Sequence, residues 1–442
     1  MKEKDRTGWR YLGFFLSGLC WSSLIIWTNL YILLLANLIL FDLFITRWID
    51  WSLRRYGLPK LLQTSLEWVF ILLLAISCSL CIKVLLVETY KIPTPSMEET
   101  LLAGDFIFVS KLAYGPRLPE TPLAIPFYHN KLPSGKKSYS ERIRKPYKRL
   151  GGFSAVRRGD IIVFNFPEGD TMVVQYPGQN YYSLVRQYGR EYILSEFDII
   201  THPVDKRENY VKRCIGLPGD TIRISNGEVE VNGDRNPAFP TQKFKYYVTT
   251  NGAPLPDALL DSLKILKTSV TYNPANSLHV LFLTGENIHF LRSHPMVRSV
   301  QRYAEPMLSF QNQEIFPHSN FYRWTGDNFG PLIVPARGDT LLISMLNLPL
   351  YSRLIDVYEG NDLRIKGGEI YINDQIADQY VVQMDYYFVM GDNHHNSADS
   401  RYWGFVPEDH LLGKAVTVWF SIEPEQSIIE GLRKERIFSA IK

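Results

Sequence analysis

The chain has 442 residues, which is too long for one small domain and allows two or three units of about 150 residues each. Its 48 basic and 45 acidic side chains leave a net charge of +3, which argues against a nucleic-acid-binding protein with a strongly basic face. With 13% aromatic and 21% charged residues the chain can bury a core, and its four cysteines exclude a disulfide scaffold.

The N-terminal residues 11–46 contain no Lys or Arg, and Asp42 is their only charged side chain. A helix crosses a bilayer with about 20 residues, so this stretch fits one long tilted span or a helical hairpin that turns near residues 27–29. It is too long for a cleaved signal peptide. Basic residues flank both ends, and the positive-inside rule places both flanks in the cytoplasm. Since only a hairpin satisfies that placement, we predict a membrane hairpin and a basic cytoplasmic loop over residues 1–60.

A second apolar run covers residues 68–82, between Glu67 and Lys83. The Lys83 side chain can extend toward the membrane surface, so apolar residues beyond it lengthen the span. We therefore predict a transmembrane helix over residues 61–88. The basic flank before it lies inside, so the chain after Glu88 lies outside the cytoplasmic membrane.

The outer region, residues 89–442, is rich in alternating apolar and polar segments bounded by Gly, Pro, Asn and Asp, as in residues 160–166, 219–224 and 228–232. This alternation predicts antiparallel strands and a mainly β domain. Residues 116–150 are rich in Pro, Lys, Arg and Tyr, which indicates an irregular surface loop. Its basic side chains form a solvated face or contact anionic lipid headgroups.

A weak internal similarity links two segments of the outer region. Residues 222–232 are IRISNGEVEVN, and residues 363–373 are LRIKGGEIYIN. Each segment carries Gly between two short alternating runs, and we predict a β-hairpin with a glycine turn for each.

The candidate chemistry begins with Ser96, which follows the predicted span in the proline-rich stretch 90–97. The chain has no G-x-S-x-G elbow, and no His motif supports a Ser–His–Asp triad. A lysine is the alternative base, provided that burial lowers its pKa. Lys212 lies among apolar residues of the segment 210–220, whereas the neighbouring Arg213 stays charged.

Four segments then occur in a distinctive order: 93–101 (PTPSMEETL), 104–115 (GDFIFVSKLAYG), 210–220 (YVKRCIGLPGD) and 390–407 (MGDNHHNSADSRYWGFVP). After a membrane anchor, they resemble the successive conserved boxes of the bacterial type I signal peptidase (leader peptidase) family, whose members are serine peptidases with a Ser/Lys dyad. The resemblance covers only these boxes, but their order makes it specific.

The resemblance implies a role for each matching residue. Ser96 resembles the nucleophile and Lys212 the general base. Ser397 resembles the hydroxyl that hydrogen-bonds and orients the lysine, and Thr94 the hydroxyl that forms an oxyanion hole with the Ser96 backbone N–H. Residues that resemble the structural support of the site are Arg213, Asp399 and Arg401. Positions that line shallow pockets for small side chains are matched by Tyr90, Ile92 and Val211.

Two departures from the family pattern are evident. The family has Arg and Asp after Gly-Asp-Asn, whereas His394 and His395 stand here, so we expect no salt bridge at that place. A metal site of these histidines with His410 is the alternative, but no ligand-spaced partner supports it, and we expect neither a metal nor a cofactor. The chain between Lys212 and Ser397 is long, which predicts an insertion at about residues 235–365.

The resemblance implies a membrane-bound serine endopeptidase that removes signal peptides from exported preproteins after a small-x-small motif. The protein would be a multi-pass protein of the bacterial cytoplasmic (inner) membrane, with an antiparallel β catalytic domain outside. Its partners would be exported preproteins, the lipid bilayer and the protein-export machinery, and not nucleic acid.

Two alternatives remain. One is a catalytically inactive, membrane-anchored envelope binding module of the same fold, against which the complete set of Ser96, Lys212, Thr94 and Ser397 argues. The other is a self-cleaving Ser/Lys peptidase of the repressor type, which the predicted membrane spans and the missing DNA-binding segment disfavour.

Overall fold

The structure is a computed structural model of the whole chain. It describes residues 59–441 apart from 126–127, 236–241, 267–268, 306–313, 425 and 427–429, together with seven positions between 14 and 45. The predicted membrane hairpin over residues 11–46 therefore lies almost entirely outside the described residues, as do the basic flanks at residues 2–10 and 47–58.

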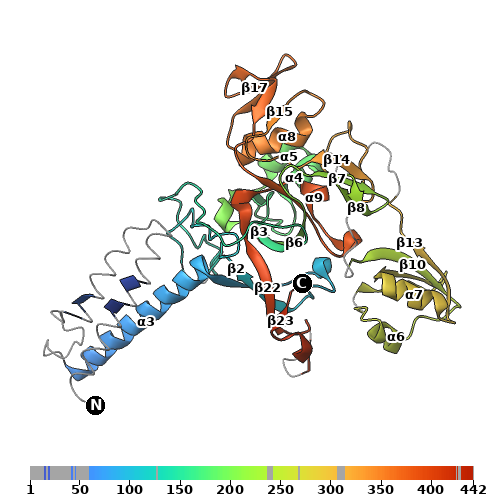
Figure 1. Cartoon of the computed structure of the whole chain (residues 1–442), viewed down its shortest axis with the longest axis horizontal. Coiled ribbons are helices and arrows are strands. Elements are labelled where there is room, and N and C mark those ends of the chain that lie inside the picture. The colour runs from blue at the N-terminus through green and yellow to red at the C-terminus, as the bar shows by residue number, and fades with distance from the viewer. Residues whose placement is uncertain are drawn as a thin grey trace.

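The continuously described part of the chain starts with the helix α3 (Lys60–Leu85), which leads into the strand β1 (Val87–Lys91). Figure 1 shows α3 projecting away from the sheets. Several of its large apolar side chains are exposed: Leu61, Leu62, Trp68, Val69, Leu72 and Ile82. Across the residues that the structure describes, no helix combines the length and hydropathy that a membrane span requires. The segment predicted as a transmembrane helix over residues 61–88 is thus helical up to Leu85, and no span is identified in it.

The main sheet holds eight antiparallel strands among the described residues, in the order β1-β2-β22-β3-β6-β20-β21, with β23 beside β22. Besides β1, these are β2 (Asp105–Ser110), β22 (Leu411–Ser421), β3 (Ile161–Asn165), β6 (Asn209–Gly216), β20 (Tyr386–Met390), β21 (Val406–Pro407) and β23 (Ser439–Ala440). The predicted mainly β, antiparallel class is confirmed.

The main sheet is covered on both faces. Ile107, Val109 and Val163 belong to one core, which also receives Ile92 and Met97 from the chain beside Ser96. The opposite core holds side chains of alternate residues in the same strands: Ile162, Phe164, Cys214 and Val389, with Trp403 packed against them. Because both faces are buried, β3 is a continuous apolar run rather than an alternating one.

The two similar segments form hairpins, as predicted. The first is β7 (Thr221–Ser225) with β8 (Glu228–Val231), and the second is β16 (Leu363–Lys366) with β17 (Glu369–Ile372). Each turn has two residues at positive φ, which include Gly227 at 76° and Gly368 at 87°. Turns of this kind match the twist of the flanking strands.

Further elements extend these hairpins: β9 (Asp234–Arg235) and β14 (Phe329–Ile333) join β7 and β8, and β18 (Gln375–Ile376) joins β17. Nearby are β15 (Thr340–Leu342), β19 (Gln379–Val381), α8 (Leu348–Arg353) and a π-helical turn, Leu354–Tyr358. Residues of both hairpins share one core with β20. A smaller unit contains β4 (Thr171–Val173), α4 (Tyr181–Tyr188), α5 (Arg190–Glu196) and β5 (Ile199–Thr201).

Residues 242–305 form what we call the insertion lobe. Its sheet has the order β11 (Thr271–Asn273), β12 (Leu278–Leu283), β10 (Phe244–Thr250) and β13 (Val297–Arg302). Its helices are α6 (Asp257–Ser262) and α7 (Gly285–Ser293). The lobe has a core of its own, which includes Val248, Leu281, Leu283 and Leu291. Figure 1 shows it as a separate body, on the far side of the main sheet from α3.

Candidate active site

Ser96 lies in the short 3₁₀ turn Pro95–Met97, directly after the edge strand β1. Pro93 and Pro95 restrict the backbone on the N-terminal side of the serine. On the other side Met97 is buried in the core. The Ser96 carbonyl oxygen accepts a hydrogen bond from the backbone N–H of Asn393 at 3.1 Å. The turn that carries the serine is therefore held by the loop after β20 and by the core beside it.

Lys212 reaches the serine from the central strand β6, where it lies opposite Ile162 of β3. Its Nζ atom is 2.7 Å from the Ser96 Oγ atom. The lysine is only 4% exposed and the serine 8%. Burial lowers the pKa of Lys212 from 10.5 to about 8, although the charges of Asp399 and Asp392 oppose this change. A buried lysine with such a pKa can accept a proton near neutral pH.

The predicted oxyanion donors lie beside the serine. The Thr94 Oγ1 atom is 3.4 Å from the Ser96 Oγ atom. The Ser96 backbone N–H belongs to the first turn of a 3₁₀ helix, where N–H groups have no acceptor inside the helix. Both donors can therefore face a negative charge that develops next to the serine oxygen.

Ser397 is buried close to the nucleophile turn, but it does not make the predicted hydrogen bond to Lys212. Among the described residues, its Oγ atom has no hydrogen-bond partner. The two segments approach each other across Gly391, at which a Cβ atom would lie 2.2 Å from the Ser397 Oγ atom and 2.6 Å from the Ser96 carbonyl oxygen. The segment that contains Ser397 therefore lies at the site, as the sequence predicts. Whether the Ser397 side chain contacts Lys212 depends on how closely the two backbones approach, and no sequence motif encodes that distance.

Two arginines support the site through separate carboxylates. Arg401 makes two hydrogen bonds of 2.8 Å to Asp399. Arg213 instead binds Asp392, at 2.7 and 2.6 Å. Arg213, Asp399 and Arg401, which all resemble the structural support of the site, therefore belong to two ion pairs with different carboxylates. The two pairs are linked through the chain, because the Gly391 N–H donates to Asp399 at 3.1 Å.

A cleft of about 790 Å³ runs beside the serine and the lysine. The three residues predicted to line small pockets all border it: Tyr90, Ile92 and Val211. Its walls are the chain from Tyr90 to Met97 and the first half of β6, so the cleft lies between an edge strand and a central strand.

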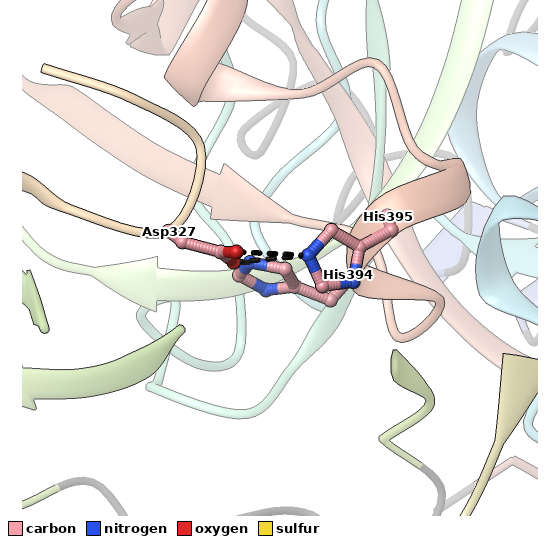
Figure 2. A group of neighbouring side chains, drawn as sticks. All are labelled: Asp327, His394 and His395. Atoms are coloured by element: carbon pink, nitrogen blue, oxygen red, sulfur yellow. Dashed lines mark hydrogen bonds and ion pairs between the residues drawn. The ribbon is translucent and has the colours of Figure 1, made fainter. Parts of the chain in front are cut away.

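His394 and His395 form a cluster with Asp327 of the segment before β14 (Figure 2). Each imidazole Nε2 atom lies 3.0 Å from Asp327 Oδ1. An Arg401 guanidinium nitrogen lies 2.8 Å from the same Nε2 atom of His394, where a cation would have to sit. The residue set therefore does not fit a metal. It forms a hydrogen-bond network in which the His394 Nδ1 atom has no partner among the described residues. His410 lies elsewhere, hydrogen-bonded to Asp409 and Arg207, which contradicts a site of the three histidines.

This network lies directly after Gly-Asp-Asn, at the two positions where the sequence departs from the family pattern and where we expect no salt bridge. Burial and the neighbouring Arg401 lower the pKa of His394 to about 3, so this imidazole is neutral at physiological pH. Four further residues of this region are not predicted from the sequence: Asp392, Asn393, Asp327 and Lys243. Of these, only Asp392 and Asn393 lie in one of the four family-like segments, 390–407, where their position next to Gly391 is a signal that could have identified them.

The family model for signal peptidase, peptidase S26, matches residues 65–253 and 374–420, which together are just over half of the chain. The chain belongs to the signal peptidase family, peptidase S26. The stretch between the two matched ranges, residues 254–373, overlaps the predicted insertion at 235–365.

Curated relatives agree with this assignment. Signal peptidase I of Buchnera aphidicola subsp. Schizaphis graminum is 26% identical over 358 residues, covering 79% of this chain and 73% of that protein. Signal peptidase I of Aquifex aeolicus is 25% identical over 355 residues, covering 80% of this chain and 82% of that protein. Probable signal peptidase I-2 of Synechocystis is 33% identical over 146 residues, covering 30% of this chain and 66% of that protein. This signal peptidase family member is therefore a peptidase.

Proposed function

We propose that this protein removes signal peptides from exported preproteins after a small-x-small motif, with Ser96 as the nucleophile and Lys212 as the general base. The observation that carries the proposal is the 2.7 Å approach of the Lys212 amine to the Ser96 hydroxyl in a buried setting. A nucleophile and a base within hydrogen-bond reach are the minimum arrangement for covalent acyl transfer.

The chemistry follows from this pair. The neutral Lys212 amine accepts the Ser96 hydroxyl proton as Oγ bonds to the scissile carbonyl carbon. The resulting oxyanion receives hydrogen bonds from the Ser96 N–H and the Thr94 hydroxyl, and each such donor contributes roughly 3 kcal/mol to transition-state stabilisation. Collapse of the intermediate breaks the C–N bond, and the lysine ammonium returns its proton to the departing amine. Water, deprotonated by the same lysine, then hydrolyses the ester and restores the serine.

The cleft suits an extended peptide with small side chains. β1 is an edge strand, and β20 pairs with β6 only from Arg213 onward. Among the described strands, backbone N–H and C=O groups of β1 and of the first half of β6 therefore have no strand partner on the side of the cleft. A peptide strand can hydrogen-bond to such edges. Ile92 and Val211 are apolar walls that favour small apolar side chains near the serine.

We also propose that the protein is a multi-pass protein of the bacterial cytoplasmic membrane, with residues 1–60 as hairpin and cytoplasmic loop and the catalytic domain outside. The apolar runs at 11–46 and 68–82 and their basic flanks support this topology. The exposed apolar side chains of α3, such as Trp68 and Leu72, further support it because water is an unfavourable environment for them.

The test is cleavage of a purified preprotein by the purified full chain in detergent, with the cleavage site read by mass spectrometry. Ser96→Ala and Lys212→Ala should each lower kcat by at least about a thousandfold, since both groups act in one chemical unit. Ser195→Ala and Lys366→Ala change exposed residues of the same types and should leave kcat unchanged. Full activity of either site variant would overturn the mechanism, and binding without cleavage by the unaltered chain would favour the inactive binding module.

A further inference from the structure

Lys243 is a buried lysine at the entrance of the insertion lobe, and its charged end lies against the turn that carries Ser96. Its side chain is only 1% exposed. The Nζ atom lies 2.7 Å from a carboxylate oxygen of Glu99 and 3.2 Å from one of Glu98. Both acids directly follow the nucleophile turn, so one amine from the lobe binds two consecutive residues of the catalytic segment.

The backbone of Lys243 is tied to the other side of the site. Its N–H donates to the Asp392 carbonyl at 2.8 Å, and its carbonyl accepts from the His394 N–H at 2.8 Å. Between these contacts lies Asn393, whose N–H holds the Ser96 carbonyl oxygen and whose side-chain amide donates to Glu98 at 3.2 Å. Lys243 therefore joins the nucleophile turn and the 391–397 loop from both its side chain and its backbone.

Glu99 has a backbone conformation that is unusual for a residue with a side chain. Its φ is +80°, in the left-handed region that favours glycine and that side chains other than glycine's rarely adopt. The ion pair with Lys243 is positioned to stabilise that conformation. The chain after Ser96 is thus held in a sparsely populated conformation by a contact from the lobe.

A buried ion pair adds little to stability, because desolvation of the charges cancels much of their attraction. The ion pair does fix the relative positions of the two segments that carry its partners, since each partner must stay within hydrogen-bond distance of the other. We propose that Lys243 is a positioning residue that holds the nucleophile turn through Glu98 and Glu99, so that the insertion lobe sets the orientation of Ser96. This inference rests on the proposed function of Ser96 and adds a further residue to its machinery.

The expected signature is a loss in kcat with little change in KM. A nucleophile displaced by about 1 Å loses roughly a hundredfold in rate, whereas Lys243, Glu98 and Glu99 are not among the residues that line the cleft. Lys243→Met keeps the aliphatic stem and removes the charge, and kcat should fall about 10- to 100-fold with KM within twofold. Lys243→Arg keeps the charge and should retain more kcat than Lys243→Met.

A companion variant separates positioning from folding. Lys243→Met alone leaves two carboxylates without their cation and is expected to lower Tm. Combining it with Glu98→Gln and Glu99→Gln removes all three charges, so Tm should recover while kcat stays low. Lys245→Met is the matched control: its amine lies 4.4 Å from the centroid of the Tyr303 ring, and the kcat of this variant should stay within twofold of the unaltered chain.

All assays use the full chain in detergent and the same preprotein as above. Recovery of kcat together with Tm in the triple variant, unchanged kcat in Lys243→Met, or equal losses in the Met and Arg variants would overturn the inference. If Ser96→Ala remains inactive in those cases, only the positioning role fails. Full activity of Ser96→Ala would instead mean that the proposed function itself is wrong.

Discussion

At the scale of single residues, the buried amine of Lys212 is the most informative group of the site. Its pKa of about 8, against 10.5 for an ordinary lysine, results from burial and is only partly offset by Asp399 and Asp392. Neither carboxylate is its hydrogen-bond partner, because Asp399 binds Arg401 and Asp392 binds Arg213. Because Arg401 and Arg213 bind these two carboxylates, the carboxylates stabilise the charged form of Lys212 less.

This pKa predicts the pH dependence of cleavage. At pH 7 only about one Lys212 amine in ten is neutral, and that fraction rises to nearly all by pH 10. We therefore expect kcat/KM to rise about tenfold per pH unit below 8 and to level off above it, as measured with a short peptide substrate between pH 6 and 10. A flat profile between pH 6 and 9 would contradict Lys212 as the base.

The same burial predicts a cost in stability. Between pH 8 and 10.5 the unfolded chain holds the lysine proton and the native chain does not, so stability rises with pH across this window. Below pH 8 both states are protonated, and the full penalty, on the order of 3 kcal/mol, is present. Lys212→Met should therefore raise Tm at pH 7, with a gain that shrinks by pH 10. Lys366→Met, at an exposed position, should show no such pH dependence.

At the scale of elements, the site depends on how closely the loop after β20 approaches the turn after β1. Gly391 is the point of contact, because a Cβ atom there would overlap the Ser397 hydroxyl and the Ser96 carbonyl oxygen. The backbone angle φ of Gly391 would allow other residues, but there is no space for a side chain. Close approach, rather than turn geometry, therefore explains glycine at this position.

Gly391→Ala tests this approach. To relieve the overlap the two segments must move apart, so we expect kcat to fall at least tenfold and stability to drop by about 1–3 kcal/mol. Gly285→Ala is the control, because it has open space around it at the start of α7 and should change neither quantity. Thermal unfolding and steady-state cleavage measure both effects, and wild-type kcat in Gly391→Ala would show that the segments can separate without loss.

At the scale of the whole molecule, the protein is an antiparallel β body with a helix on one side and a lobe on the other (Figure 1). The helix is tied to the body where it ends, since Glu88 lies 3.2 Å from the Lys83 amine and 2.7 Å from that of Lys111. If α3 is anchored in a membrane as proposed, these contacts hold the cleft at a constant distance from the membrane surface.

Cysteine labelling tests the topology. In a chain with Cys20, Cys78 and Cys81 replaced by serine, Asp5→Cys should react with an impermeant maleimide only after the cells are opened. Phe153→Cys, at a position that is 85% exposed, should react with spheroplasts directly. Cys214 can remain, because burial raises the pKa of its thiol and keeps it unreactive. Labelling of residue 5 from outside would refute the hairpin.

Much of the fold, and the proximity of Ser96 and Lys212, could be predicted from the sequence. Alternating runs such as 228–232 encode strands locally, and the order of the boxes around Ser96 and Lys212 identified the family. These signals are short-range, because a strand pattern or a proline-flanked serine is complete within a few residues.

The contacts that complete the site were decided by the tertiary structure. The partner of Arg213, the histidines on Asp327 and the pairing of Lys243 with Glu98 and Glu99 all join residues far apart in the chain. Charges alone do not predict such pairs, because every ionisable residue has many partners of opposite sign in the sequence. Only the folded structure selects the actual partners among them, because it decides which groups are buried and how far apart they lie.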